Sequence, residues 1–221
     1  MRRTLPALLL LAAAPLSAQE TRFTPSMSPG NRLELENING AIVITQGSGR
    51  TAEVVVTKRV IRGDGSYVKA IMEEADGMIR ICTIYTNKDP NRKSCKGDNS
   101  NNSRRGEDYD QVEMRYEVRV PAGVIVDAEN VNGTITATGL EAEASLTTVN
   151  GGITFTGNSA RQLETVNGKV KGTFLKPSWS GTLEVSSVNG GVELTFPANF
   201  DAELSGETVN GGVSSDFPVT I

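Results

Sequence analysis

A branched apolar residue followed by Asn-Gly occurs six times in this chain, and this repeat constrains the fold more than any other feature. The copies are Ile38-Asn39-Gly40, Val131-Asn132-Gly133, Val149-Asn150-Gly151, Val166-Asn167-Gly168, Val188-Asn189-Gly190 and Val209-Asn210-Gly211. The last five copies start 18, 17, 22 and 21 residues apart. A unit of nearly constant length is typical of repeat architectures, in which each unit buries its apolar face only by stacking on its neighbours.

Apolar residues also recur at fixed positions around each copy. The fourth residue after the branched one is apolar every time: Ile42, Ile135, Ile153, Val170, Val192 and Val213. The third residue before it is apolar in the first five copies: Leu35, Ala128, Leu146, Leu163 and Val185. Polar residues alternate with the apolar ones after the corner, so each unit predicts a half-buried strand, a corner and a second half-buried strand.

We expect both the branched residue and the residue three before it to face the interior, which requires a bend or bulge between them. Asn-Gly is expected to supply the positive φ angles of this tight corner. Gly151→Val should then destabilise the protein more than Gly157→Val, because only Gly151 would need a positive φ.

The pattern predicts an all-β protein, and more specifically a single-stranded β-solenoid with a wider, strand-rich N-terminal half. Coils stacked at about 4.8 Å would share one core, and their asparagines would form a ladder of amide hydrogen bonds. Asn-Gly between strands is also typical of hairpins, so a sandwich of six hairpins is the alternative architecture. Repeat length and near-identical flanks favour the solenoid, which we place at residues 121–221.

The first 18 residues have the pattern of an export signal. Arg2 and Arg3 precede an apolar run that is too short to span a bilayer, and small residues then lead to a cleavage site before Gln19. We therefore expect an exported protein with no membrane span after cleavage, located in the periplasm, on the cell surface or outside the cell. In such a compartment Cys82 and Cys95 are expected to form a disulfide. A redox-active or metal-binding pair would usually have a closer spacing.

Residues 19–120 are expected to form a strand-rich region that is continuous with the solenoid. Strands are predicted at 51–61, 67–73, 78–85 and 111–120, with Asp76-Gly77 as a hairpin turn. The segment 67–73 also has helical spacing, so a short helix is the alternative there. Residues 87–108 are almost entirely polar and predict a mobile loop.

Composition excludes several classes of function. The 221 residues contain no histidine, so a Ser/His/Asp triad and a histidine-based zinc site cannot be built. The chain carries 22 basic and 26 acidic residues, and loss of Arg2 and Arg3 with the signal makes it still more acidic. This balance argues against nucleic acid as a partner.

Few side chains are candidates for specific contacts. The candidates for contact with a partner are Trp179 in a spacer between repeats and, in the polar loop, Arg92, Lys93, Arg104 and Arg105.

A row of carboxylates stands two residues before the branched residue in four copies, at Glu36, Glu129, Glu164 and Glu207. Calcium could bind such a row, but the other two copies carry Thr147 and Ser186, so we predict a polar outer edge and no metal, cofactor or catalytic site.

The Glu/Thr-x-Val-Asn-Gly-x-Val-x-Leu pattern follows a strand-rich half that contains Glu117-Val118-Arg119-Val120-Pro121-Ala122-Gly123-Val124. In these features the chain resembles a bacterial family of uncharacterised proteins described as putative adhesins with β-strand repeats. The resemblance covers most of the mature chain. It implies a right-angled or triangular β-solenoid at the cell envelope without known catalysis.

The sequence therefore favours an exported, non-enzymatic protein that presents a surface for adhesion or assembly at the cell envelope. Its partner would be an envelope protein or a polysaccharide. Two alternatives from other classes are a β-helical carbohydrate-active enzyme and a ligand-sensing module of the envelope.

Overall fold

Alternation of apolar and polar residues produces thirteen strands in the part of the chain that the computed structural model describes, which is residues 18–86, 89–96, 111–178, 181–203, 205 and 214–216. The predicted signal peptide lies outside this part except for its last residue. The strands are β1 (Gln19–Phe23), β2 (Arg32–Asn39), β3 (Ile42–Gln46), β4 (Glu53–Arg62), β5 (Val68–Ala75), β6 (Met78–Tyr85), β7 (Gln111–Val120), β8 (Ile125–Asn132), β9 (Ile135–Asn150), β10 (Ile153–Asn167), β11 (Val170–Phe174), β12 (Glu184–Asn189) and β13 (Val192–Thr195). The only helical element among the described residues is the 3-10 turn η1 (Gly65–Tyr67), so the all-β prediction is confirmed.

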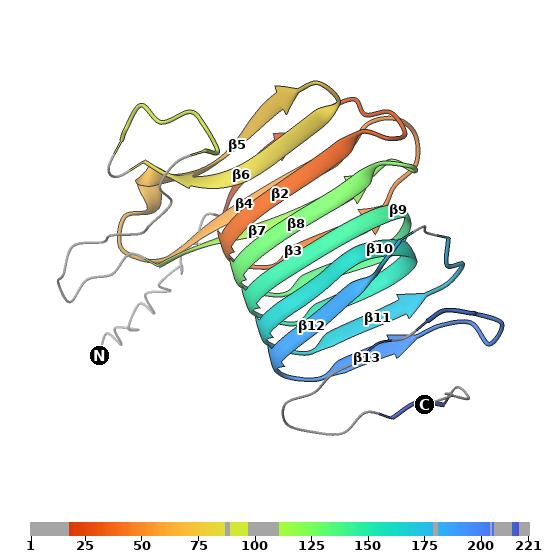
Figure 1. Ribbon diagram of the computed structural model, residues 1–221. Helices are drawn as coiled ribbons and strands as arrows, with labels where there is room; N and C mark the ends of the chain where they lie inside the picture. Colours follow the sequence, from red (N-terminus) through yellow and green to blue (C-terminus); the bar gives the residue numbers. More distant parts are fainter. Residues whose placement is uncertain are drawn as a thin grey trace, which may run out of the picture.

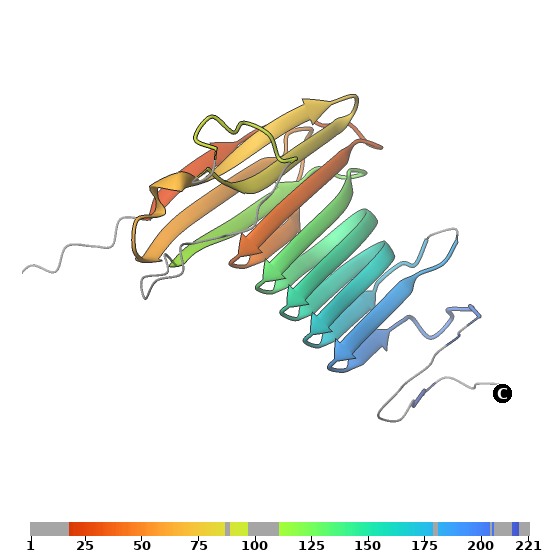
Figure 2. The same cartoon turned by 60° about the vertical axis from the view of Figure 1, so that its left-hand side comes forward.

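Hydrogen bonding arranges these strands in two layers that the long strands β9 and β10 connect (Figures 1 and 2). One layer contains β5, β6, β2, β8, the second halves of β9 and β10, and β12. The other contains β1, β4, β7, β3, the first halves of β9 and β10, β11 and β13. Register shifts between Thr156 and Gln162 of β10 mark the bend where the chain passes from one layer to the other.

The repeat units stack parallel and in register. Asn132 pairs with Asn150, Asn150 with Asn167, and Asn167 with Asn189. The first unit joins the same stack, since Asn39 pairs with Asn132 although the chain makes a long excursion between them. We call these five stacked units rungs 1 to 5, in the order of Asn39, Asn132, Asn150, Asn167 and Asn189.

The main hydrophobic core lies between the two layers, and a small second cluster surrounds the two cysteines. The main core includes Leu33 and Leu35 of β2, Ile42 and Ile44 of β3, and the corresponding residues of the next three rungs. The positions predicted to face inward at four after and three before the branched residue are buried in rungs 1 to 4. In rung 5 Val185 is half-buried and Val192 is 45% exposed.

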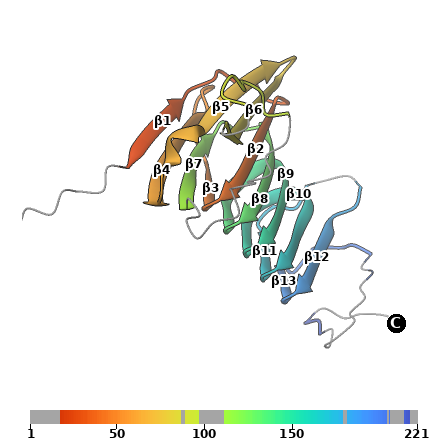
Figure 3. The same ribbon diagram turned by 90° about the vertical axis from the view of Figure 1, so that its left-hand side faces the viewer.

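The excursion between rungs 1 and 2, which contains β4 to β7, and the preceding strand β1 add strands to the N-terminal end of the stack, where the pairing differs from a single winding (Figure 3). β1, β4 and β7 pair antiparallel on one layer, and β5 and β6 form an antiparallel hairpin on the other. The hairpin turns at Asp76-Gly77, as predicted, and both residues have positive φ angles of 23° and 77°. All four predicted strands of this region are present, and 68–75 is a strand, not the alternative helix.

Candidate functional site

The corners of the repeat form a continuous asparagine ladder along one edge of the stack. The side-chain Nδ2 of each asparagine donates to the Oδ1 of the asparagine in the preceding rung, at 2.9, 2.9, 2.8 and 2.8 Å for Asn132, Asn150, Asn167 and Asn189. The predicted amide bonding between rungs is therefore present. The sixth corner, Asn210 and Gly211, lies outside the described residues.

Glycine follows each asparagine because two backbones approach closely, and not generally because φ is positive. Gly40 and Gly133 have φ angles of 119° and 149°, but Gly151, Gly168 and Gly190 are outside the positive-φ range. The predicted positive φ is thus wrong for these three glycines. A Cβ on Gly133, Gly151, Gly168 or Gly190 would lie 2.0 to 2.2 Å from the carbonyl oxygen of the preceding glycine in the stack.

The expectation that Gly157→Val destabilises the protein less than Gly151→Val assumes that only Gly151 requires glycine, and this assumption is wrong. A Cβ on Gly157 would lie 2.5 Å from the carbonyl oxygen of Leu140 and 2.7 Å from the ring of Phe155. Gly157 is therefore not a permissive site, and equal damage at both positions would say nothing about the repeat.

A second ladder lies inside the corner and was not predicted. The residue directly before the branched one turns inward, and its side chain donates to the carbonyl oxygen of a corner glycine. In rungs 3, 4 and 5 the donors are Thr148, Thr165 and Ser187, at 3.0, 2.7 and 2.8 Å. In rungs 1 and 2 both Asn37 and Asn130 donate to Gly40. The sequence signal was the constant Asn, Thr or Ser at this position.

The branched residues of the repeat form a row on the outer face of β2, β8, β9, β10 and β12, which is half-buried at Ile38 in rung 1 and exposed in rungs 2 to 5. We call this row, Ile38, Val131, Val149, Val166 and Val188, the valine row. The last four side chains are 38%, 39%, 39% and 72% exposed, so the prediction that they face the interior is wrong. The alternation of the strand continues to the corner without a bulge, and the polar residue of the inner ladder occupies the inward position.

Carboxylates flank the valine row on the same face. Glu36 pairs with Glu129, and the row continues through Thr147, Glu164 and Ser186. Burial raises the pKa of Glu36 above its ordinary value, the nearby charge of Arg80 opposes this shift, and Glu129 adds to it. A shallow depression of about 490 Å³ is lined by both glutamates together with Ile38, Val131 and Val149.

These carboxylates do not form a metal centre within the described ranges. The structure there contains no group of three or more Cys, Asp and Glu side chains close enough to hold an ion. Thr147 separates Glu129 from Glu164, and Ser186 follows Glu164 in rung 5, so the row is a mixed polar edge.

Cys82 and Cys95 form the predicted disulfide, with their Cα atoms 5.8 Å apart. Arg92 is only 9% exposed, and its guanidinium donates to the carbonyl oxygens of Ser94 and Cys95 at 3.0 Å. It therefore stabilises the disulfide loop and is not an exposed partner contact as predicted, whereas Lys93 is exposed. Of the predicted loop 87–108, residues 89–96 are described.

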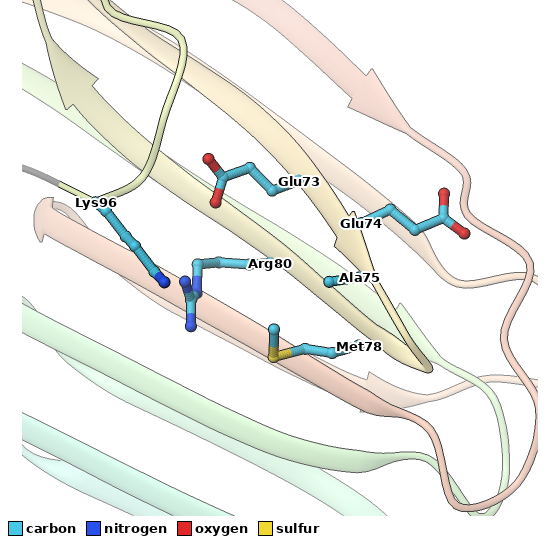
Figure 4. Close-up of a pocket in the computed structure, with 6 residues that line it drawn as sticks. All are labelled: Glu73, Glu74, Ala75, Met78, Arg80 and Lys96. Atoms are coloured by element: carbon cyan, nitrogen blue, oxygen red, sulfur yellow. The ribbon is translucent and has the colours of Figure 1, made fainter.

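A second depression, of about 430 Å³, lies beside this loop on the β5–β6 hairpin (Figure 4). Two of its charged residues have partners. Arg80 donates to Glu34 at 2.6 Å and lies 3.2 Å from Glu36. Glu73 accepts from the backbone of Cys95 at 3.0 Å, and hydrogen bonds from Ser94 and this amide lower the pKa of Glu73. Glu73 therefore anchors the loop at this depression.

The remaining predicted contacts, Trp179, Arg104 and Arg105, lie outside the described residues. In the part of the chain that is described, no helix has the length and apolar character needed to cross a membrane.

Comparison with known proteins gives two similar solved structures. One is described as a putative cell adhesion protein from Clostridium sporogenes, with 8% identity, a TM-score of 0.45 and coverage of 81% of this chain and 99% of that one. The other is a putative adhesin from Parabacteroides distasonis, with 12% identity, a TM-score of 0.22 and coverage of 81% and 98%. No protein-family model and no curated protein matches the chain.

Proposed function

We propose that this protein is an exported, non-enzymatic β-solenoid that presents a surface for adhesion or assembly at the bacterial cell envelope. The valine row carries this proposal. The partner would be an envelope protein or a polysaccharide that contacts the row along the axis of the stack.

In-register stacking turns one exposed apolar residue per unit into a continuous feature. Val131, Val149 and Val166 are adjacent, and each exposes more than a third of its surface although apolar core positions lie close by. Exposed apolar patches with a polar rim are typical of interaction sites. Here the carboxylate row and the asparagine ladder provide the rim.

The ladder also makes the surface rigid. Four amide hydrogen bonds and the inner ladder fix the spacing of the rungs, so little conformational freedom is left to lose when a partner binds. A pre-ordered surface binds with a smaller entropic cost than a flexible one.

Export is supported by the N-terminal sequence pattern and by the Cys82–Cys95 disulfide, because disulfides persist in oxidising compartments. A carbohydrate-active enzyme of similar build would need a converging acid pair. Glu36 and Glu129 are neighbours, but Glu36 also lies 3.2 Å from Arg80, which Glu34 shares, so the two carboxylates are not a free acid pair.

The test is binding of purified protein to cell envelopes of the producing bacterium and to a panel of envelope polysaccharides. We expect Val149→Lys with Val166→Lys to weaken binding at least tenfold without lowering the melting temperature. The matched control is Thr138→Lys with Thr154→Lys, which changes two exposed residues on the other layer and should leave binding intact. Equal losses in both variants, or no loss in either, would contradict the role of the valine row, and release of sugar products would favour the enzyme.

A further inference from the structure

Asn-Gly is the dipeptide in which an asparagine side chain is most easily attacked by the backbone, because glycine has no Cβ to hinder the approach. We propose that Asn189-Gly190 is a site of spontaneous modification to aspartate and isoaspartate, while the ladder protects the four described corners that precede it. The reaction needs only water. It goes beyond the proposed binding function and does not depend on it.

The chemistry takes place within one corner. The backbone nitrogen of Gly190 loses its proton and bonds to Cγ of Asn189, and the side-chain amide leaves as ammonia. Water then opens the resulting succinimide at one of its two carbonyls. Opening at one gives aspartate, and opening at the other gives isoaspartate, which has an extra backbone carbon.

Hydrogen bonding of the attacking nitrogen distinguishes the corners. The backbone N–H of Gly40, Gly133, Gly151 and Gly168 donates to the backbone carbonyl of the asparagine in the next rung, at 2.8, 2.9, 3.0 and 3.1 Å. These bonds hold the nitrogen in the plane of the sheet and away from the side chain. In the described part of the chain the Gly190 N–H makes no such bond, and rung 5 is the last rung within that part.

The side chains show the same difference. The Oδ1 of Asn132, Asn150 and Asn167 each accepts from the next rung, whereas within the described residues Asn189 only donates, to Asn167 at 2.8 Å. Exposure does not separate the sites, since Asn132, Asn150, Asn167 and Asn189 are all exposed. The ladder and not burial must therefore provide the protection.

Modification of Asn189 would also make the next corner, at Asn167, more reactive. The product carboxylate cannot donate to Oδ1 of Asn167, and the two oxygens would repel each other. Isoaspartate would further displace the Asn189 carbonyl that accepts from the Gly168 N–H at 3.1 Å. We therefore expect the reaction to proceed inward, with Asn189 first and Asn167 next.

The experiment incubates the full-length folded protein at mildly alkaline pH and follows each site by mass spectrometry after digestion at glutamate. Cleavage after Glu184 and Glu193 isolates Asn189, and other glutamates place the remaining five Asn-Gly sites in separate peptides. Asn189 should react at least tenfold faster than Asn132 and Asn150. In urea these three sites should react at similar rates, since the ladder is then absent.

Two variants test the inward order. Asn189→Asp, which mimics the product, should accelerate the reaction of Asn167, and the conservative Asn189→Gln should accelerate it less because glutamine can still donate. If folded Asn189 reacts within threefold of Asn150, or if unfolding leaves the ratio unchanged, the proposal is wrong.

Discussion

Gly151→Ala tests the packing of the corners most directly. The added Cβ would lie 2.1 Å from the carbonyl oxygen and 2.5 Å from the carbonyl carbon of Gly133, and 3.0 Å from the amide nitrogen of Thr134. All three atoms are backbone, so no side chain can rotate away. Contacts under 3.0 Å are essentially never observed for a real Cβ, and rungs 2 and 3 must therefore separate locally by about 1 Å, given the close packing of protein interiors.

That separation breaks the bonds that join these rungs at the corner. They are Gly133 N–H to Asn150 O at 2.9 Å, Ile135 N–H to Gly152 O at 3.1 Å, and the amide bond from Asn150 to Asn132 at 2.9 Å. At about 0.5 to 1.5 kcal/mol for each net hydrogen bond, the loss is about 1.5 to 4.5 kcal/mol. For a chain of this size that lowers the melting temperature by about 3 to 18 °C.

Thermal unfolding followed by far-ultraviolet circular dichroism measures the effect, with Gly191→Ala as the control. A Cβ on Gly191 meets no atom within 4 Å, whereas one on the adjacent Gly190 would lie 2.0 Å from the carbonyl oxygen of Gly168. Gly191→Ala should therefore melt within about 2 °C of the wild type, as is usual for a surface substitution. If Gly151→Ala also melts there, close backbone approach is not the reason for glycine at the corners.

Three further perturbations test other parts of the structure. Thr148→Val removes the donor to the Gly133 carbonyl and should cost about 1 to 3 kcal/mol in urea unfolding, while Thr147→Val, on the outer side of the same strand, should be nearly neutral; similar losses would contradict the inner ladder. Replacing Cys82 and Cys95 by serine opens the disulfide and should lower the free energy of unfolding by about 3 kcal/mol, so an unchanged melting temperature in oxidising buffer would exclude a stabilising role. Burial raises the pKa of Tyr116 far above its ordinary value, against the hydrogen bond with Thr83; because only the unfolded chain can then ionise this group, stability should fall as the pH rises above about 10. Tyr116→Phe should reduce that fall, and an unchanged pH profile would show that Tyr116 does not cause it.

Several structural elements could be predicted from the local sequence pattern alone. The strand at 111–120 and the hairpin turn at Asp76-Gly77 follow from alternation and turn chemistry, which involve only neighbouring residues. The Cys82–Cys95 bond follows from the expected oxidising compartment and from the presence of only two cysteines in the sequence. The asparagine ladder follows once equivalent residues are assumed to stack.

Whether the side chains of the valine row point inward or outward could not be predicted in this way. In rungs 1 to 5 the branched residue stands three positions after an apolar residue that faces the core. A bulge between the two would turn the branched residue inward, whereas continued alternation turns it outward, and the sequence pattern agrees with both. The choice depends on the residue in between, since Thr148 and Thr165 find acceptors in glycine carbonyls that only the neighbouring rung supplies. The burial of Arg92 likewise depends on carbonyls that the closed disulfide loop brings together.

By itself the sequence determined that the chain forms stacked β-strands with asparagine at every corner, because a repeated pattern of period two can bury its apolar residues only against copies of itself. Only the tertiary structure decided which residues the stack leaves outside. It also decided that rung 1 lies beside rung 2 despite the long excursion. These features depend on hydrogen bonds between residues far apart in the chain, and no local pattern specifies such partners.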